Sequence, residues 1–122
     1  MRFTRVYADA TGESHYEDID AAMVPQSFAP PAPPFSLSEM TQSTGMAFAR
    51  FPVDWDGDWH PTPRRQYLIF LSCEFEGETS DGDRRRHAPG SVVLLEDTTG
   101  QGHHARVVGD TDVLATVVQL PD

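Results

Sequence analysis

The sequence predicts an all-β protein whose strands form a sandwich or a barrel. In the second half of the chain, short apolar runs alternate with turn sequences such as Asp81-Gly82 and Pro89-Gly90. Glycine in such pairs adopts a positive φ without steric cost, which favours hairpins. No window in this half has the 3.6-residue apolar period of a helix. Short strands at this spacing are typical of sandwiches and barrels.

The expected strands follow one another along the chain. The first is RFTRVYA at the N-terminus, after which the chain is polar and irregular up to residue 44. The other candidates are GMAFARF, RQYLIFLSCEFEGET, RRRHA, SVVLLE, HHARVVG and VLATVVQL. Turn-forming residues separate most of them. We therefore expect one domain in two parts, an N-terminal strand with a proline-rich arm over residues 1–44 and a β-barrel over residues 45–122.

The arm contains FAPPAPPF, from Phe28 to Phe35. Its prolines fix φ and lack an amide donor, so neither a helix nor a central strand can form there. A linker is one interpretation. Two phenylalanines left in water would expose a large apolar area, however. We therefore expect an ordered arm whose two rings pack against the sheet, within the chain or across a neighbouring subunit.

Composition limits the classes of partner. The formal net charge is -10 over 122 residues, so a nucleic acid or an anionic membrane surface would repel the chain. A single cysteine, Cys73, excludes an internal disulfide and fits a reducing compartment. The first residues lack the apolar stretch of a secretory signal, and no apolar run reaches the roughly 20 residues that span a bilayer. We expect a cytoplasmic protein.

Polar residues interrupt the chain at WHPTPRRQ, just before its most apolar strand. The two prolines favour an extended backbone for the residues that precede them. Alternation then places four polar side chains on one face: His60, Thr62, Arg64 and Gln66. Leu68 and Phe70 follow on the same face. Such a face would line a cavity that is polar at its mouth and apolar within, as small-molecule pockets usually are.

A second polar cluster, EDTTGQGHH, ends in His103 and His104. Adjacent residues of a strand point to opposite faces, so only one of the two can face inward. His60, one of these histidines and Gln66 could form a metal site, because imidazole suits several transition metals. Glu96 and Asp97 are candidate acids, although acidic residues near turns are usually solvated.

Structural interpretations are also open for four residues: His87, Cys73, Arg64 and Arg65. His87 ends RRRH and is expected to be exposed. Cys73 is expected to be a small packed thiol, because the acidic residues nearby do not favour a thiolate. Arg64 and Arg65 are adjacent, so one should face the cavity, where a guanidinium could bind a carboxylate or phosphate group. An ion pair within the protein is the alternative for either arginine.

The stretch from Gly57 to Leu120 resembles a small single-domain cupin, whose fold is a double-stranded β-helix, or jelly roll. The first cupin motif has two histidines, a glutamate and a glycine, where this chain has His60, Thr62, Gln66 and Cys73. Gly100 and His103 match the end of the second motif. DGDRRRHAPGSVVLLED resembles the hairpin between the two motifs. The resemblance therefore implies a cupin whose metal-binding motif is degenerate.

The function implied by the resemblance is a small-molecule enzyme acting on a small polar or anionic substrate. In one form, His60, Gln66 and His103 hold a divalent transition metal (Zn, Ni, Fe or Mn) for non-oxidative isomerase, cyclase or lyase chemistry. In a metal-free form, the same histidines act as acid and base while Arg64 or Arg65 holds the substrate. The alternatives are a cupin that binds a ligand without turnover and a scaffold with a vestigial pocket. A homodimer is also implied, because cupins commonly dimerise.

Overall fold

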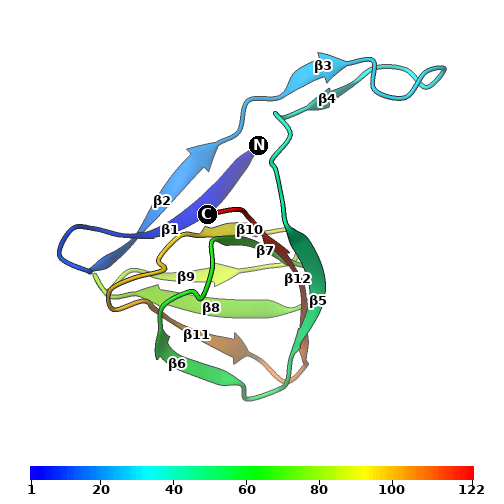
Figure 1. Cartoon of the computed structure of the whole chain (residues 1–122). Coiled ribbons are helices and arrows are strands. Elements are labelled where there is room, and N and C mark those ends of the chain that lie inside the picture. The colour runs from blue at the N-terminus through cyan, green and yellow to red at the C-terminus, as the bar shows by residue number, and fades with distance from the viewer.

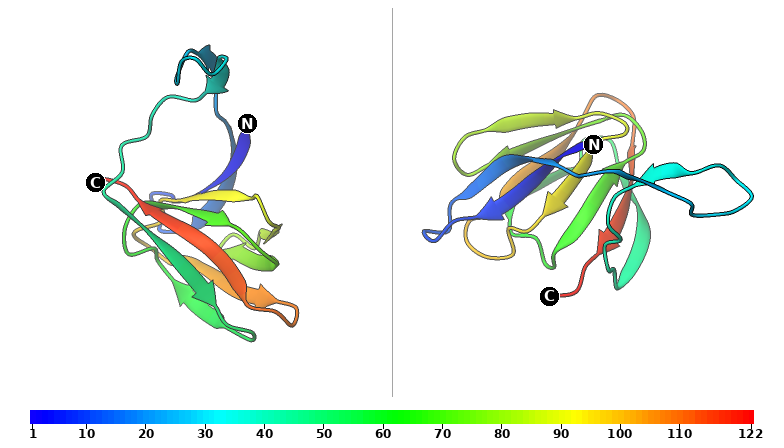
Figure 2. Two further views of the ribbon diagram at one scale, coloured as in Figure 1. Left: turned by 90° about the vertical axis from the view of Figure 1, so that its right-hand side faces the viewer. Right: turned by 90° about the horizontal axis from the view of Figure 1, so that it is seen from above.

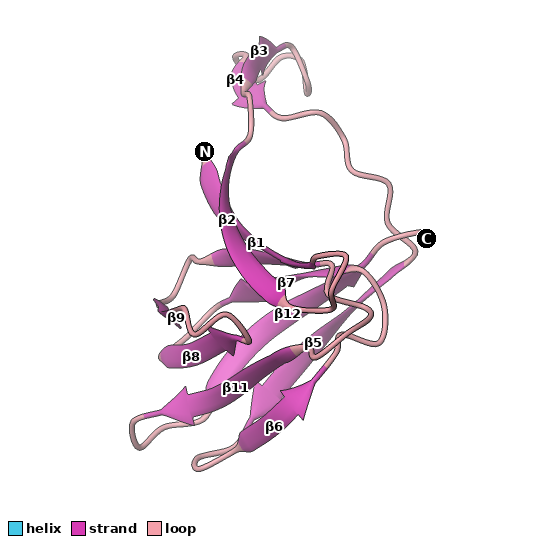
Figure 3. Cartoon of the chain, turned by 90° about the vertical axis from the view of Figure 1, so that its left-hand side faces the viewer, coloured by secondary structure: helices cyan, strands magenta, loops and turns pink.

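The computed structural model describes all 122 residues and contains twelve strands and no helix (Figure 1). Ten strands form two sheets that face each other, and the other two form a small hairpin on an arm (Figure 3). The all-β class expected from the sequence is therefore confirmed. No element has the helical length and apolar character needed to cross a bilayer as a helix.

The larger sheet is mixed. It contains β1 Arg2–Ala8, β2 Ser14–Asp20, β5 Gly45–Phe51, β7 Gln66–Phe70, β10 Val92–Leu95 and β12 Val113–Gln119. Their order in the sheet is β2-β1-β10-β7-β12-β5. Only β1 and β10 pair in parallel, and all other neighbours are antiparallel.

The smaller sheet is antiparallel throughout. It contains β6 Asp56–His60, β8 Glu74–Thr79, β9 Arg84–His87 and β11 His103–Val108. Their order is β6-β11-β8-β9, so the two strands that carry His60 and His103 are neighbours.

The core lies between the two sheets. Alternate residues of each strand point inward, for example Leu68 and Phe70 of β7 and Ala105 and Val107 of β11. The buried cluster draws on both sheets and comprises Val6, Leu68, Phe70, Phe75, Val93, Leu95, Ala105, Val107, Val113 and Ala115. Packing of two apolar faces is what holds such sheets together.

The strand expected over RQYLIFLSCEFEGET is wrong as a single element, because it is divided into β7 and β8 in different sheets. The chain turns between them, and Cys73 has a φ of 58° there. This turn brings Phe70 and Phe75 onto facing sheets, with ring centroids 5.2 Å apart. Cys73 itself is half-buried and packs against the core.

Residues 1–44 contain more strand than the sequence indicated. β2 pairs with β1 along its whole length, and β1 pairs with β10. Both N-terminal strands are therefore part of the larger sheet. β2 was missed because only Tyr16 and Ile19 among its seven residues are large and apolar. Tyr16 nevertheless packs against the core cluster.

The arm carries a short hairpin of β3 Val24–Gln26 and β4 Phe35–Leu37. It projects away from the two sheets (Figure 2). Phe28 and Phe35 pack edge to face on each other, with ring centroids 5.6 Å apart, and are 55% and 45% exposed. Within the chain, the expectation that they pack against the sheet is therefore wrong, because extended connections carry the hairpin away from it.

Candidate functional site

β6 and β11 bring His60 and His103 together. The two residues are register partners on neighbouring antiparallel strands, so their side chains share one face. Their ring centroids are 4.7 Å apart. Gly102 allows this close approach, because it has a φ of 72° and a Cβ there would collide with the backbone of His60. The sequence-predicted meeting of these two imidazoles is thus present in the structure.

His103 is held by a buried carboxylate. Nδ1 of His103 lies 2.6 Å from one oxygen of Asp97, and the hydroxyl of Thr62 donates to the other oxygen at 2.7 Å. Asp97 is completely buried. Because a carboxylate accepts hydrogen bonds, Nδ1 is the donor, and in the neutral form of this ring the lone pair lies on Nε2. An oriented imidazole of this kind can act as a general base.

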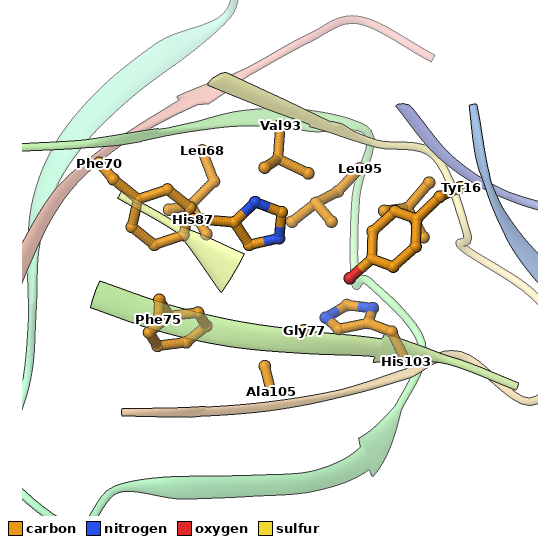
Figure 4. Close-up of a pocket in the computed structure, with 11 residues that line it drawn as sticks. Tyr16, Leu68, Phe70, Phe75, Gly77, His87, Val93, Leu95, His103 and Ala105 are labelled. Carbon is orange, nitrogen blue, oxygen red and sulfur yellow. The ribbon is translucent and has the colours of Figure 1, made fainter. Parts of the chain in front are cut away.

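A cavity of about 30 Å³ lies between the sheets beside His103 (Figure 4). Most of its eleven lining residues have apolar side chains: Val6, Leu68, Phe70, Phe75, Val93, Leu95 and Ala105. The polar side chains in its wall are Tyr16 from β2, His87 from β9 and His103 from β11. Figure 4 shows all three directed towards the same space. Strands far apart in the sequence therefore place three hydrogen-bonding side chains around one small interior volume.

The expectation that His87 is exposed is wrong. His87 is only 6% exposed, and its ring stacks on Phe70 with centroids 5.4 Å apart and planes 4° from parallel. His87 ends β9 on its inward face. Its burial was missed in the sequence because three arginines precede it. Burial lowers the pKa of His87 to about 4, and the charge of Arg85 acts in the same direction. His87 is therefore neutral at pH 7.

Tyr16 is the second residue of the cavity that sequence reasoning missed. Burial raises the pKa of its phenol above the ordinary value, although the nearby Arg85 opposes this shift. Arg85 lies over the ring, 4.7 Å from its centroid, and bonds to Asp18. The hydroxyl of Tyr16 is therefore protonated at pH 7 and available as a hydrogen-bond donor.

The expectation of one continuous polar strand face at WHPTPRRQ is wrong. Residues 61–65 form a loop between β6 and β7, which lie in different sheets. Thr62 is buried against Asp97, whereas Arg64 is exposed on the loop and does not line the cavity. Gln66 begins β7, is half-buried and does not line the cavity either. The prolines extend the segment, but a loop can be extended without being a strand.

Arg65 is a structural residue rather than a free guanidinium at the mouth. Its Nε lies 2.6 Å from one oxygen of Glu96, and Nε of Arg5 lies 2.6 Å from the other. Burial alone would raise the pKa of Glu96, but the hydrogen bonds from the two arginines lower it below its ordinary value. Glu96 is therefore an ionised member of an ion-pair network that ties β1 to the loop before β7.

His104 and His15 lie outside the cavity. His104 stacks on Trp59 with centroids 5.7 Å apart, and its Nε2 bonds to Asp56. Of the adjacent histidines, His103 is thus the one that faces inward. His15 lies between two carboxylates, those of Asp9 and Asp81, at 2.6 and 2.9 Å.

The donors around the two central histidines do not fit a metal centre with three protein ligands. Nδ1 of His60 is within 3.0 Å of two backbone carbonyls, and Nδ1 of His103 is held by Asp97, so each ring offers one nitrogen. Gln66 belongs to the facing sheet. The one cluster of three possible donors among His, Cys, Asp and Glu lies elsewhere, at Asp9, Glu13 and His15. His60 and His103 together therefore offer two ligand atoms, one fewer than such a centre needs.

Comparisons with known proteins show resemblance only at the level of the structure. No protein-family model matches the chain, and no curated protein matches it. The conserved protein SPY1581 of unknown function from Streptococcus pyogenes has a TM-score of 0.48 and 19% identity, covering 70% of this chain and 71% of its own. Protein NMB1881 from Neisseria meningitidis has a TM-score of 0.46 and 10% identity, covering 68% of this chain and 84% of its own.

The close approach of β8 to the cavity groups can be tested at Gly77. A Cβ at Gly77 would collide with the hydroxyl of Tyr16. We expect Gly77→Ala to lower the free energy of unfolding by about 1–3 kcal/mol, as overpacking of a core does. Tyr16→Phe removes the colliding oxygen and should restore most of this loss in the double variant. Urea denaturation of the four proteins measures both effects. If Gly77→Ala lowered the free energy of unfolding equally in the presence and absence of the Tyr16 hydroxyl, the close contact between Gly77 and this hydroxyl would be contradicted.

Buried, neutral His87 should make the protein acid-sensitive. Its folded-state pKa of about 4 lies below the ordinary value of 6.5, so the unfolded state binds the proton more readily. The contribution of neutral His87 to the free energy of unfolding is complete above pH 6.5. This contribution, about 3 kcal/mol in total, is lost as the pH falls towards 4.

Chemical denaturation at pH 7 and pH 4.5 should therefore show a smaller acid loss in His87→Phe than in the native protein. His104→Gln, on the outer surface, controls for the removal of an imidazole and should keep the full acid loss. The same pH dependence in all three proteins would show that His87 is not the group responsible.

Proposed function

We propose that this chain is a small-molecule enzyme of the cupin type, in which the interior of the sandwich performs acid–base chemistry without a metal. The observation that carries this proposal is the hydrogen-bonded series Thr62–Asp97–His103, which ends beside a cavity. A fully buried carboxylate is costly unless it is hydrogen-bonded, and here both of its oxygens are occupied. The arrangement holds His103 in one tautomer.

The division of roles follows from the hydrogen bonds. Asp97 accepts a hydrogen bond from Nδ1–H of His103 and stabilises the imidazolium that forms when Nε2 takes a proton from a substrate. His60 lies against the same ring and adds a second imidazole, while Nδ1 of His60 faces backbone carbonyls. Two adjacent imidazoles can remove a proton from one atom of a substrate and return it to another atom. That chemistry is common to isomerisation, hydration and lyase reactions.

A cupin that binds a ligand without turnover is the alternative. The apolar lining of the cavity favours it, because apolar walls with a few polar groups are also the anatomy of a binding site. The two proposals differ in what Asp97 does, since binding alone does not require a base.

Asp97→Asn distinguishes these proposals with little change in volume. The amide can donate to Nδ1 of His103, which moves the proton to Nε2 and removes the free lone pair. We expect turnover of small polar metabolites, followed by proton NMR against a panel, to fall about 10²- to 10⁴-fold. His103→Gln should cause a similar loss. Thr111→Val, on an exposed loop, serves as the control.

Ligand-induced thermal stabilisation measured in the same variants completes the test. Binding that persists in Asp97→Asn while turnover is lost supports the enzyme. A panel compound that binds the native protein and both variants without turnover in any of them would favour the binding module.

We also propose that the chain forms a homodimer by reciprocal exchange of its arms. A groove of about 610 Å³ lies between the outer face of the larger sheet, which contributes Phe3, Tyr67, Ile69 and Val118, and the base of the chain's own arm, which contributes Val24, Ser38, Glu39 and Thr41. The arm projects away from its own sheets (Figures 1 and 2). Its two phenylalanines, Phe28 and Phe35, are exposed. A projecting apolar hairpin and an apolar groove on one chain suit a two-fold symmetric pair, in which each copy covers the other's groove.

The aromatic pair of the arm provides the test of this assembly. We expect the native protein to sediment as a dimer and the double variant Phe28→Ser/Phe35→Ser to sediment as a monomer in analytical ultracentrifugation. Trp59→Ser removes an exposed aromatic from the smaller sheet and should leave the dimer intact. A native monomer, or a dimer that survives loss of both phenylalanines, would disprove arm exchange.

A further inference from the structure

The polar atoms of Tyr16 and His87 face the cavity without a protein partner. Neither the Tyr16 hydroxyl nor a ring nitrogen of His87 takes part in a hydrogen bond within the protein, although His87 is more than nine-tenths buried. No side-chain polar atom that is fully shielded lacks a partner. These atoms are therefore open to the cavity, and a buried polar group left without a hydrogen bond costs about 1–3 kcal/mol.

The two groups lie over the same point of β8. A Cβ at Gly77 would meet the Tyr16 hydroxyl and would lie 3.3 Å from Nε2 of His87. Glycine within a strand weakens it and often marks a place where another group approaches the backbone closely. The absence of a side chain at Gly77 thus makes room for both polar atoms beside each other.

The size and charge of the cavity restrict what it can hold. A volume of about 30 Å³ is enough for a water-sized group. The nearest cation, Arg85, is already paired with Asp18 and Asp83. His103 is paired with Asp97. Neutral His87 and protonated Tyr16 offer donors and an acceptor but no net charge. An uncharged oxygen satisfies them, whereas an anion would enter without a counter-charge.

We propose that Tyr16 and His87 form a binding site for one uncharged oxygen atom, which belongs either to a water molecule or to the carbonyl or hydroxyl group of a ligand. This inference rests on the proposed function, because the oxygen would lie in the same cavity that His103 lines. Tyr16 donates to the oxygen, and the ring of His87 supplies the second hydrogen bond. The reactive group of the substrate is therefore expected to be neutral, and an anionic group has to lie outside this cavity.

A high-resolution crystal structure of the ligand-free protein tests for the water. We expect one density peak within hydrogen-bonding distance of the Tyr16 hydroxyl and a ring nitrogen of His87. The double variant Tyr16→Phe/His87→Phe should lose that peak while remaining folded, because both changes keep an aromatic ring in place. Circular dichroism and thermal melting verify the fold of the variant.

NMR titration of the His87 ring distinguishes the two sources of the oxygen. Acetone is the neutral carbonyl probe, and acetate is its charged counterpart of similar size. A response to acetone that is absent with acetate, and absent in Tyr16→Phe, indicates that the site accepts a ligand oxygen. A water peak without a response to acetone indicates that water is the oxygen held. An empty cavity without a response to acetone, or an equal response to acetate, would overturn the inference.

These outcomes are separable from those of the proposed function. An empty cavity together with loss of turnover in Asp97→Asn would remove the oxygen site and leave the acid–base enzyme standing. A bound water together with unchanged turnover in Asp97→Asn and His103→Gln would do the reverse.

Discussion

The burial of one carboxylate determines the geometry of the interior. Asp97 has no exposed surface, and the segment that carries it is joined to the loop after β6 in two ways. The Thr62 hydroxyl donates to its side chain, and the Thr62 amide donates to its backbone carbonyl at 3.0 Å. The other carboxylate oxygen holds His103 at the start of β11. Removing the Thr62 hydroxyl or the His103 ring would leave one oxygen of the buried carboxylate without a hydrogen bond, which costs more than the loss of an exposed ion pair.

Because that carboxylate fixes both loops, the polar residues of the interior fall into a definite arrangement. His103 has one nitrogen bound and one free, and His60 is placed against it by strand register rather than by a side-chain bond. Tyr16 and His87 enter from two other strands and meet over a glycine. Apolar residues make up the rest of the wall, which keeps His87 neutral and Tyr16 protonated. The site is therefore a small apolar volume with several oriented hydrogen-bonding side chains.

The charged residues of the surface have a different role. Arg5 and Arg65 share Glu96, which joins the first strand to the loop before β7. His15 joins the turn after β1 to the turn after β8 through two carboxylates. The arginines that appeared in the sequence as candidates for an anion site are thus either paired, as Arg65 is, or exposed away from the cavity, as Arg64 is. This distribution agrees with a neutral group in the interior.

The sequence by itself determined the all-β class and most strands of the second half. It also identified His60 and His103 as candidate residues of one site. Apolar alternation and turn residues are local signals, so they survive in a linear sequence. Only the tertiary structure decided the remaining partners of the site. Tyr16 is in a polar strand, His87 ends a run of arginines, and Asp97 lies in a loop. His87 and Asp97 are buried and Tyr16 is half-buried because segments distant in the sequence pack over them, and such packing leaves no periodic pattern in the residues around a single position.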